Sequence, residues 1–544
     1  MPNSAAKSVS GIVVEAVQSW QVSLLSATAT SALPISLTTP IPGTATTGMR
    51  LVIGVFGHTT VGTITVTGTA VNSGGALAET SISIPVQETP GNVYFYTTTN
   101  VFASINASGI TLGTGLTLGT IVIFGVQAAK RMIVGDVKVD DKRKDFQPIH
   151  QRGSVDEIYF NVPLSEDPML EISTAYYPDD SLFVMLGGYN GSTVGTSIPA
   201  VPIAVLASTS CITGSTASAS LQPTAPGMVI QIVLAGGPAT AATVAVTGTN
   251  LYGETITETI VPSTKVAGTY TSSNVFATIA AAGIVYGAFG GAATIVVSAV
   301  FGWSQAAAAG PSYGTATFAL ENYDSVGSFV APYWLVDEWT LEGGMDKELK
   351  LMVKGPCQSI YPVGDPTNAN NQITTFAQPL DEVITGWSAV AFLDNVSAAP
   401  GTTQTLDLVD FKITCKLGAV MKHTSAFNPP LRKPSRAYLK RRRIEVDVTF
   451  DMTNTTFQQE YLNGFRANKR RVLQLQIRGP LMGQVAGVNY YLGTTITIPL
   501  RWANDAVRDF TKENVDLKLK GIGYFEPALG YSHQLTWFTR LPQW

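Results

Sequence analysis

The sequence contains few charged residues, few cysteines and few histidines. Asp, Glu, Lys and Arg make up 13% of its 544 residues, about half of the share usual in soluble proteins. The net charge of −4 argues against general binding to nucleic-acid phosphates. The three cysteines lie far apart and form no CxxC pair, so they fit neither a zinc site nor a disulfide framework. The four histidines show no metal-binding spacing.

Motifs for catalysis are also absent. The chain has no GxSxG motif, which would present a nucleophilic serine, and its glycine pairs lack a phosphate-loop lysine. Adjacent carboxylates in a strand point to opposite faces and make a poor acid–base pair. Such neighbours occur at Asp140–Asp141, Asp156–Glu157, Asp179–Asp180 and Asp337–Glu338. A loop cation site at Asp179–Asp180 is the lesser alternative. We therefore expect no enzymatic activity, no bound metal and no cofactor.

The N-terminal residues lack the apolar core of a secretion signal, so we expect synthesis and assembly in a cytoplasm. One uncharged stretch, residues 280–303, is long enough to be considered as a membrane helix. Gly287, Gly290 and Gly291 lie in its middle, where the turn of a β-hairpin would be. We therefore expect strands there and no membrane contact.

Two long segments, residues 26–128 and 201–306, hold almost no charge and repeat one another. Thr63–Thr69 (TITVTGT) matches Thr243–Thr249 (TVAVTGT), and Asn100–Ile110 (NVFASINASGI) matches Asn274–Ile284 (NVFATIAAAGI). The matches keep their order, which indicates a duplicated domain of roughly a hundred residues. Short alternating strands and glycine-rich turns predict an immunoglobulin-like (Ig-like) β-sandwich in each copy.

The last hundred residues show the sharpest secondary-structure pattern. Residues 444–450 alternate apolar and polar side chains, as in a strand with one buried face. Phe457, Tyr461 and Phe465 share one side of a helix expected over residues 453–471. Three further strands are predicted at 472–478, 494–501 and 515–521. This order predicts an antiparallel sheet or barrel that carries one helix.

Two segments of the charged part carry a family resemblance. They are Phe510–Gly523 (FTKENVDLKLKGIG), with the helix and strands before it, and Trp334–Leu351 (WLVDEWTLEGGMDKELKL). They resemble the closing and middle segments of the tail tube proteins of long-tailed bacteriophages. By analogy of fold, the resemblance implies a subunit of stacked hexameric or trimeric rings in the virion tail. It further implies assembly in the host cytoplasm, passage of double-stranded DNA without specific binding, and the tape measure and tail-end proteins as partners.

Charge returns abruptly outside the two repeats. This composition predicts one discontinuous tail tube domain from residues 1–25, 129–200 and 307–544, interrupted by the Ig-like copies at 26–128 and 201–306. The predicted fold class is therefore mostly β: a tail-tube-like β-sandwich or barrel with one packed helix, and two inserted Ig-like sandwiches. Such sandwiches resemble the modules that decorate phage virion proteins.

One polar strand face and one basic segment are the candidate functional surfaces. An acidic or neutral lumen would let DNA slide. We predict that the residues lining it are Glu445, Asp447 and Asp451, with Gln474 and Gln476 on a nearby strand. The basic segment comprises Arg432, Lys433, Arg436, Lys440, Arg441, Arg442 and Arg443. We favour an arm between subunits, paired with acids such as Asp140–Asp141 of a neighbour, over contact with DNA phosphates.

These observations predict a structural virion protein, a tail tube subunit that forms the conduit for DNA ejection and carries its sandwiches on the outside. The near-neutral, threonine-rich sandwiches also suit weak contact with cell-surface glycans. The alternative is a surface adhesin or carbohydrate-binding protein built from β-sandwich modules. Such a protein would usually carry an export signal or an anchor.

Overall fold

The fold is known from a computed structural model. It describes residues 11–16, 22–29, 50–56, 62–70, 76–80, 94–98, 102–112, 120–126, 130–132, 136–145, 163–176, 196–224, 226–264, 267–308, 317–323, 329–345, 347–357, 360–362, 384–405, 408–422, 436–439, 441–453, 457–509 and 515–540. Within these residues the protein is mostly β, in several antiparallel sheets. The carboxylate pairs Asp156–Glu157 and Asp179–Asp180 lie outside them.

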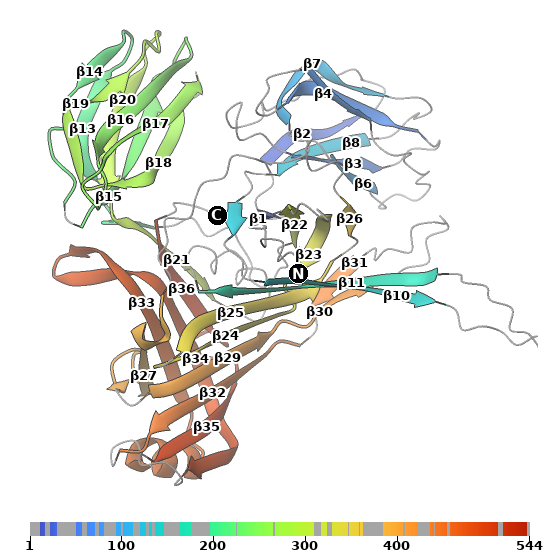
Figure 1. Ribbon diagram of the computed structural model, residues 1–544, viewed down its shortest axis with the longest axis vertical. Coiled ribbons are helices and arrows are strands. Elements are labelled where there is room, and N and C mark those ends of the chain that lie inside the picture. The colour runs from blue at the N-terminus through green and yellow to red at the C-terminus, as the bar shows by residue number, and fades with distance from the viewer. Residues whose placement is uncertain are drawn as a thin grey trace, which may run out of the picture.

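The largest sheet has 14 strands and forms the lower part of the molecule in Figure 1. Its main path runs in the order β10 (Asp136–Asp145), β11 (Pro163–Ala175), β25 (Lys347–Pro356), β24 (Glu338–Gly344), β29 (Leu408–Lys416), β32 (Arg443–Asp451), β35 (Asp516–Gly523), β34 (Val488–Asp509), β33 (Arg471–Val485), β27 (Ala389–Asn395) and β28 (Gln404–Thr405). On one flank, β36 (Gln534–Thr539) pairs with β34, β21 (Gly302–Ala308) with β36, and β12 (Thr196–Ile198) with β21.

This sheet curls around one apolar core. Thr385, just before β27, forms an isolated bridge with Glu348 of β25, so the far end of the sheet meets its beginning. Along β32 the apolar residues predicted to alternate are buried and the residues between them are more exposed. Trp334, Trp339 and Trp537 are among the largest fully buried side chains of this core. Alternation therefore separates a buried face from a polar face along β32.

The predicted helix is present but shorter than expected. It covers Phe457–Arg466 and has π-type hydrogen bonding, which widens each turn compared with an α-helix. The Tyr461 and Phe465 rings stack with centroids 5.9 Å apart, and both pack against the core of the large sheet. The apolar side of the helix thus covers one part of the curled sheet, at the bottom of Figure 1.

A second, 5-stranded sheet joins distant parts of the chain. Its order is β26 (Tyr361–Pro362), β23 (Phe329–Leu335), β22 (Thr317–Tyr323), β1 (Gly11–Ala16) and β9 (Lys130–Met132). Ala331 and Trp334 of β23 also contribute to the core of the large sheet. Strands from all three charged pieces therefore pair with one another, but in two sheets and not in a single one.

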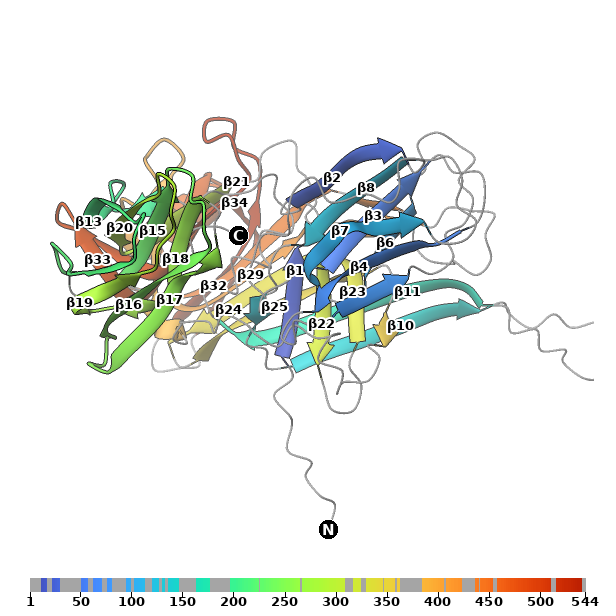
Figure 2. The ribbon, with the colours of Figure 1, turned by 90° about the horizontal axis from the view of Figure 1, so that it is seen from above.

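Each neutral repeat folds as two facing sheets with matching strand order. In the first copy the sheets are β2 (Val22–Ala29), β8 (Thr120–Val126), β3 (Arg50–Phe56), β6 (Tyr94–Thr97), and β5 (Ala76–Thr80), β4 (Ile64–Ala70), β7 (Phe102–Leu112). In the second they are β13 (Ile203–Ser210), β20 (Thr294–Val300), β15 (Met228–Ala235), β18 (Gly268–Phe276), and β14 (Ser215–Ala217), β19 (Thr278–Tyr286), β16 (Ala242–Thr249), β17 (Thr255–Thr264). Figures 1 and 2 show the copies as two separate bodies beside each other.

Details of packing repeat between the copies as well. A Cβ at Gly68 would lie 2.0 Å from the carbonyl oxygen of Ser104, and one at Gly248 would lie 1.9 Å from that of Thr278. Only glycine fits at both positions, because any side chain would collide with the neighbouring backbone. In each copy a hydroxyl also accepts a hydrogen bond from a buried backbone N–H, at Thr98 and Ser272. The two copies are therefore similar both in sequence and in the geometry of their strands.

Two predicted domain limits fall inside strands. Residue 25 lies in β2, which pairs with β8 of the first sandwich, and residue 306 lies in β21, which pairs with β36 of the large sheet. Residues 280–303 form parts of β19, β20 and β21. In the part of the chain that the structure describes, no helix has the length and apolar character needed to cross a membrane.

The second sandwich shares its core with the large sheet. Met482 and Leu492 of the β33–β34 hairpin are buried among the apolar side chains of this sandwich. Phe301, at the junction with β21, belongs to the same cluster and lies so close to Gly483 that a Cβ there would be 2.3 Å from its ring. The sandwich is therefore packed onto the hairpin and is not merely tethered to it.

Candidate functional site

The three acids predicted to line a lumen lie on the polar face of the large sheet. Glu445, Asp447 and Asp451 alternate along β32 with buried apolar residues, and Asp447 is exposed. Asp447 stands opposite Lys412 of β29 and Lys520 of β35. Asp447 therefore has a lysine on each neighbouring strand, whereas Glu445 faces Thr414 and Ile522, and Asp451 faces Asp516.

The two predicted glutamines lie elsewhere on the sheet. Gln474 and Gln476 are on β33, and β35 and β34 separate that strand from β32. Their side chains form a polar chain in which Gln476 Nε2 donates to Gln474 Oε1 at 2.7 Å and Gln474 Nε2 donates to Thr497 Oγ1 at 3.2 Å. Arg478 donates to Gln476 Oε1 at 2.7 Å. The structure therefore does not bring the acids and the glutamines together into one cluster.

A groove of about 540 Å³ hollows the polar face beside Asp447. Two of its lysines form ion pairs. Lys347 Nζ lies 3.1 Å from Asp410 Oδ2, and Lys412 Nζ lies 3.2 Å from Glu342 Oε2. Both pairs are substantially exposed, so each contributes little to stability. The charged residues lining the groove are Lys347, Lys350, Lys412, Lys518, Lys520, Glu342, Glu348, Asp410 and Asp447.

The basic segment is only partly covered by the described residues. Arg432, Lys433 and Lys440 lie outside them, and Arg436 begins β31 (Arg436–Leu439), which pairs with β30 (Ala419–Lys422). Arg441, Arg442 and Arg443 lead into β32. Arg443 Nε contacts Glu445 Oε1 of its own strand at 2.7 Å. Arg443 therefore has an acidic partner in its own chain, and the pairing of the basic segment with a neighbouring subunit stays a prediction.

One cysteine–histidine pair was not foreseen from the sequence. Cys415 Sγ lies 3.8 Å from His533 Nε2, and both residues are fully buried. Burial raises the pKa of the Cys415 thiol to about 12 and lowers the pKa of His533 to about 3. Both groups are neutral at pH 7, so the pair lacks the thiolate that a nucleophile needs. Among the described residues, no group of His, Cys, Asp and Glu could hold a metal ion.

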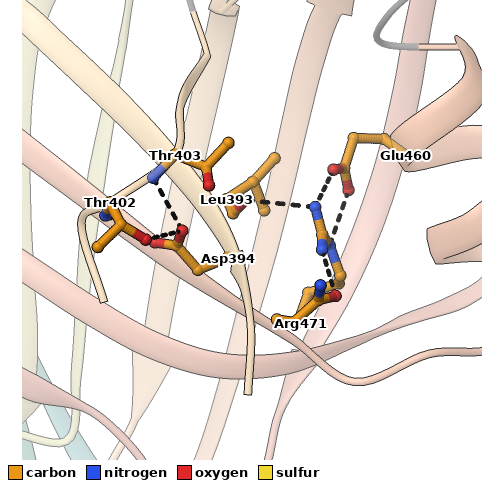
Figure 3. Close-up of polar contacts among 7 residues, drawn as sticks. Leu393, Asp394, Thr402, Thr403, Glu460 and Arg471 are labelled. Atoms are coloured by element: carbon orange, nitrogen blue, oxygen red, sulfur yellow. Dashed lines mark hydrogen bonds and ion pairs between the residues drawn. The ribbon is translucent and has the colours of Figure 1, made fainter. Parts of the chain in front are cut away.

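A buried ion pair joins the helix to the sheet (Figure 3). Arg471, at the start of β33, contacts Glu460 of the helix, and both are at most 7% exposed. The same guanidinium donates to Asn395 Oδ1 at 2.7 Å and to the Leu393 carbonyl at 3.3 Å. Burial raises the pKa of Glu460, against the opposing effect of the Arg471 charge. One cation thus fastens the helix, β33 and β27 together.

Asp394 organises the turn next to this ion pair (Figure 3). Its carboxylate accepts hydrogen bonds from the backbone N–H groups of Gly401, Thr402 and Thr403 and from the Thr402 hydroxyl, at 2.7–3.2 Å. Burial would raise the pKa of Asp394, but hydrogen bonds from Thr402, Thr403 and Gly401 outweigh it and lower the pKa. Both buried groups are satisfied by their own chain, which indicates a structural role.

Comparisons with known proteins add little. No family model matches the chain, and no curated protein matches it. Among solved structures, a similar chain is the phage-derived PBSX exported protein XepA, at 11% identity over 53% of this chain and 86% of that chain, with a TM-score of 0.13. At this TM-score the likeness carries no argument about fold or function.

Proposed function

We propose that this chain is a structural virion protein, a tail tube subunit that self-assembles into stacked hexameric or trimeric rings. In this proposal the rings form the conduit for DNA ejection, the tube meets the tape measure and tail-end proteins, and DNA passes without specific binding. The resemblance of Phe510–Gly523 and Trp334–Leu351 to tail tube proteins motivates it. The absence of a metal cluster among the described residues and the inert Cys415–His533 pair give no reason to prefer an enzyme.

The observation that best supports self-assembly is a strand pair that extends beyond the sheet. β10 and β11 pair from Asp136 to Asp145, but β11 pairs with β25 only from Met169 onward. Residues 141–145 and 163–168 therefore form a two-stranded ribbon that projects to the right in Figure 1. In the described strand order β10 is also an end strand of the sheet.

Such a ribbon suits a contact between copies. Two strands alone are only marginally stable in water, and an open strand edge offers backbone N–H and C=O groups to a partner. If the ribbon of one copy pairs with a different surface of the next, the contact is head-to-tail and closes into a ring or continues as a filament. The polar face with Glu445 and Asp447 is our proposed lumen surface, where Lys412 and Lys520 on the adjacent strands lie opposite Asp447.

Negative-stain microscopy of a shortened variant tests the proposal. Asp140 and Met169 face each other across the ribbon, so residues 141–168 can be replaced by an Asn-Gly turn, which suits a two-residue hairpin. We expect full-length protein to form rings or hollow tubes, and the shortened variant to remain a folded, dispersed subunit. A matched control replaces the turn residues Ala486 and Gly487, both at positive φ, by Asn-Gly and should assemble normally.

Each outcome has a clear meaning. Full-length protein that stays an elongated monomer under assembly conditions would overturn the tube and favour the adhesin alternative, in which the sandwiches are the binding part. Tubes formed by the shortened variant would keep the proposed function and remove the ribbon from it. Glycan-array binding by the full-length protein measures the weak cell-surface contact proposed for the sandwiches.

A further inference from the structure

A small pocket lies where the second sandwich meets the large sheet. Its walls come from the turn between β16 and β17, from β18, from the β33–β34 hairpin and from Arg540, which follows β36. Its volume is about 140 Å³, well below the roughly 300–1,000 Å³ of pockets that enclose a drug-sized molecule. Since one water molecule takes up about 30 Å³ of liquid, the space corresponds to roughly five waters. A group of the size of one sugar ring therefore suits it.

The apolar side of the pocket is buried and fixed. Val275 and Leu492 line it, and both are buried. Leu492 belongs to the core that the sandwich shares with the hairpin, and Val275 packs in a cluster with Val229, Val300 and Trp303. Because buried contacts join the sandwich to the hairpin on this side, the pocket is formed before any ligand arrives.

Tyr252 stands at the pocket on a tightly closed turn, and it is 77% exposed. Asn250 Oδ1 accepts hydrogen bonds from the backbone N–H groups of Tyr252 and Glu254, both at 2.9 Å. Asn250 Nδ2 donates to Glu254 Oε2 at 2.8 Å, and the Asn250 backbone N–H donates to the Glu254 carbonyl at 2.9 Å. The fold gains little from so exposed a ring, but a ring on a rigid backbone loses little entropy when it binds a ligand.

Two planar polar groups face the same space. Arg540 lines the pocket although it is only 9% exposed. The Asn274 backbone N–H and Nδ2 both donate to Glu258 Oε2 at 3.0 Å, which fixes this amide. A guanidinium offers several donors in one plane, and an amide offers a second N–H and a carbonyl oxygen. Such groups can bond neighbouring hydroxyls of a sugar ring.

The charges around the pocket favour a neutral ligand. Among the described residues that line it, only Arg540 is charged. The carboxylates of Glu254 and Glu258 are bonded to the two lining asparagines. An acidic ligand would therefore meet one cation and two nearby anions, and their effects oppose each other.

We propose that this pocket binds one neutral sugar residue of a glycan. The Tyr252 ring lies against the apolar C–H face of the sugar, and Arg540 and Asn274 bond its hydroxyls. This inference rests on the glycan contact proposed above for the sandwiches, and it names the site and the class of sugar.

The first sandwich is not expected to bind in this way. Its corresponding turn, between the paired Thr69 and Ala76, reads AVNSGG and has no aromatic residue. The turn of the second sandwich, between the paired Thr249 and Thr255, reads NLYGE. The copies therefore differ at the turn that carries Tyr252, and binding is assigned to the second copy alone.

A glycan array of neutral and acidic oligosaccharides, probed with full-length protein, tests the proposal. Tyr252→Ala removes the ring, and Arg540→Lys keeps the charge but loses the planar set of donors. Tyr252→Phe keeps the ring. The matched control is Phe525→Ala, which removes a 42% exposed aromatic residue outside the pocket. Thermal melting curves show whether each variant is folded, and Tyr252→Ala keeps the test decisive if Arg540→Lys does not fold.

We expect the wild type to bind neutral glycans. Loss of an aromatic contact or of a paired hydrogen bond should lower the apparent affinity at least about five-fold in Tyr252→Ala and Arg540→Lys. Tyr252→Phe and Phe525→Ala should bind like the wild type. Undiminished binding by Tyr252→Ala, or binding to acidic glycans alone, would overturn the inference.

Microscopy scores tube formation separately from binding. Tubes that bind no neutral glycan would contradict the pocket and keep the tube. A chain that binds neutral glycans through Tyr252 but forms no tubes would contradict the tube and keep the pocket.

Discussion

Replacing Arg471 by methionine should loosen the helix from the sheet. The guanidinium neutralises Glu460 and donates to β27, and its side chain is only 9% exposed. Removing one partner of a buried ion pair leaves an unpaired charge in the core, at a cost of about 3–5 kcal/mol. That is a large part of the roughly 5–15 kcal/mol by which a domain is usually stable. Tyr461 and Phe465 of the helix would still pack against the core.

The adjacent residue supplies a matched control. Arg470 contacts Glu526 at 3.1 Å, and its own side chain is 51% exposed although that of Glu526 is only 5% exposed. Glu526 also accepts a hydrogen bond from the Ala528 backbone N–H, so Arg470→Met should cost less than Arg471→Met. Because the chain has several cores, local stability is best read as urea-dependent amide hydrogen exchange of peptides covering 457–466. A loss for Arg471→Met no larger than that for Arg470→Met would refute the reasoning.

The pH dependence of this variant has a definite sign. Burial already raises the pKa of Glu460 above its ordinary value, and removal of the Arg471 charge raises it further. Between the unfolded and folded pKa values the folded state binds more protons, so stability increases as pH falls. The deficit of Arg471→Met should therefore be largest near pH 7–8 and shrink toward pH 5. The double variant E460L/R471M, which buries no charge, should recover most of the lost stability.

Three further outcomes are expected. Asp394→Ala should destabilise the β27–β28 turn by about 1–3 kcal/mol at pH 7. Because the pKa of Asp394 is lowered in the folded state, this loss of stability should become smaller in urea melts below about pH 4. A loss that does not change with pH would contradict this. Gly483→Ala should loosen the second sandwich, since its Cβ would lie 2.3 Å from Phe301; limited proteolysis unchanged from wild type would count against the shared core. Cys415 should stay unreactive to a thiol reagent in native protein at pH 8 and react on unfolding, because its pKa is about 12; rapid native labelling would refute its burial.

The secondary structure of the closing segment could be predicted with good accuracy. The strand expected at 444–450 is β32, and a helix follows it. The strands expected at 472–478 and 494–501 lie within β33 and β34, and the one expected at 515–521 begins one residue before β35. Period-two alternation succeeds here because one face of each strand is buried. The helix is shorter than expected and π-type, because aromatic spacing shows which side is buried but not how the backbone hydrogen bonds close.

Positions within the candidate surface were harder to foresee. Alternation correctly put Glu445, Asp447 and Asp451 on the polar face of β32. It gave no information about the lysines on either side, because these come from strands distant in the chain. Likewise, Cys415 and His533 are separated by more than a hundred residues, and no local signal links them. The pairing of Glu460 with Arg471 was also missed, since Arg471 was interpreted as part of a helix end and instead begins β33.

By itself, the sequence determined the β class, the duplication of the neutral module and which side of each strand is polar, because these follow from composition, repetition and local periodicity. Only the tertiary structure decided which strands are neighbours, which acids and lysines face each other, and that the second sandwich shares a core with the β33–β34 hairpin. The physical reason is that these contacts join segments far apart in the chain, and a periodic pattern specifies a face but not the partner that covers it.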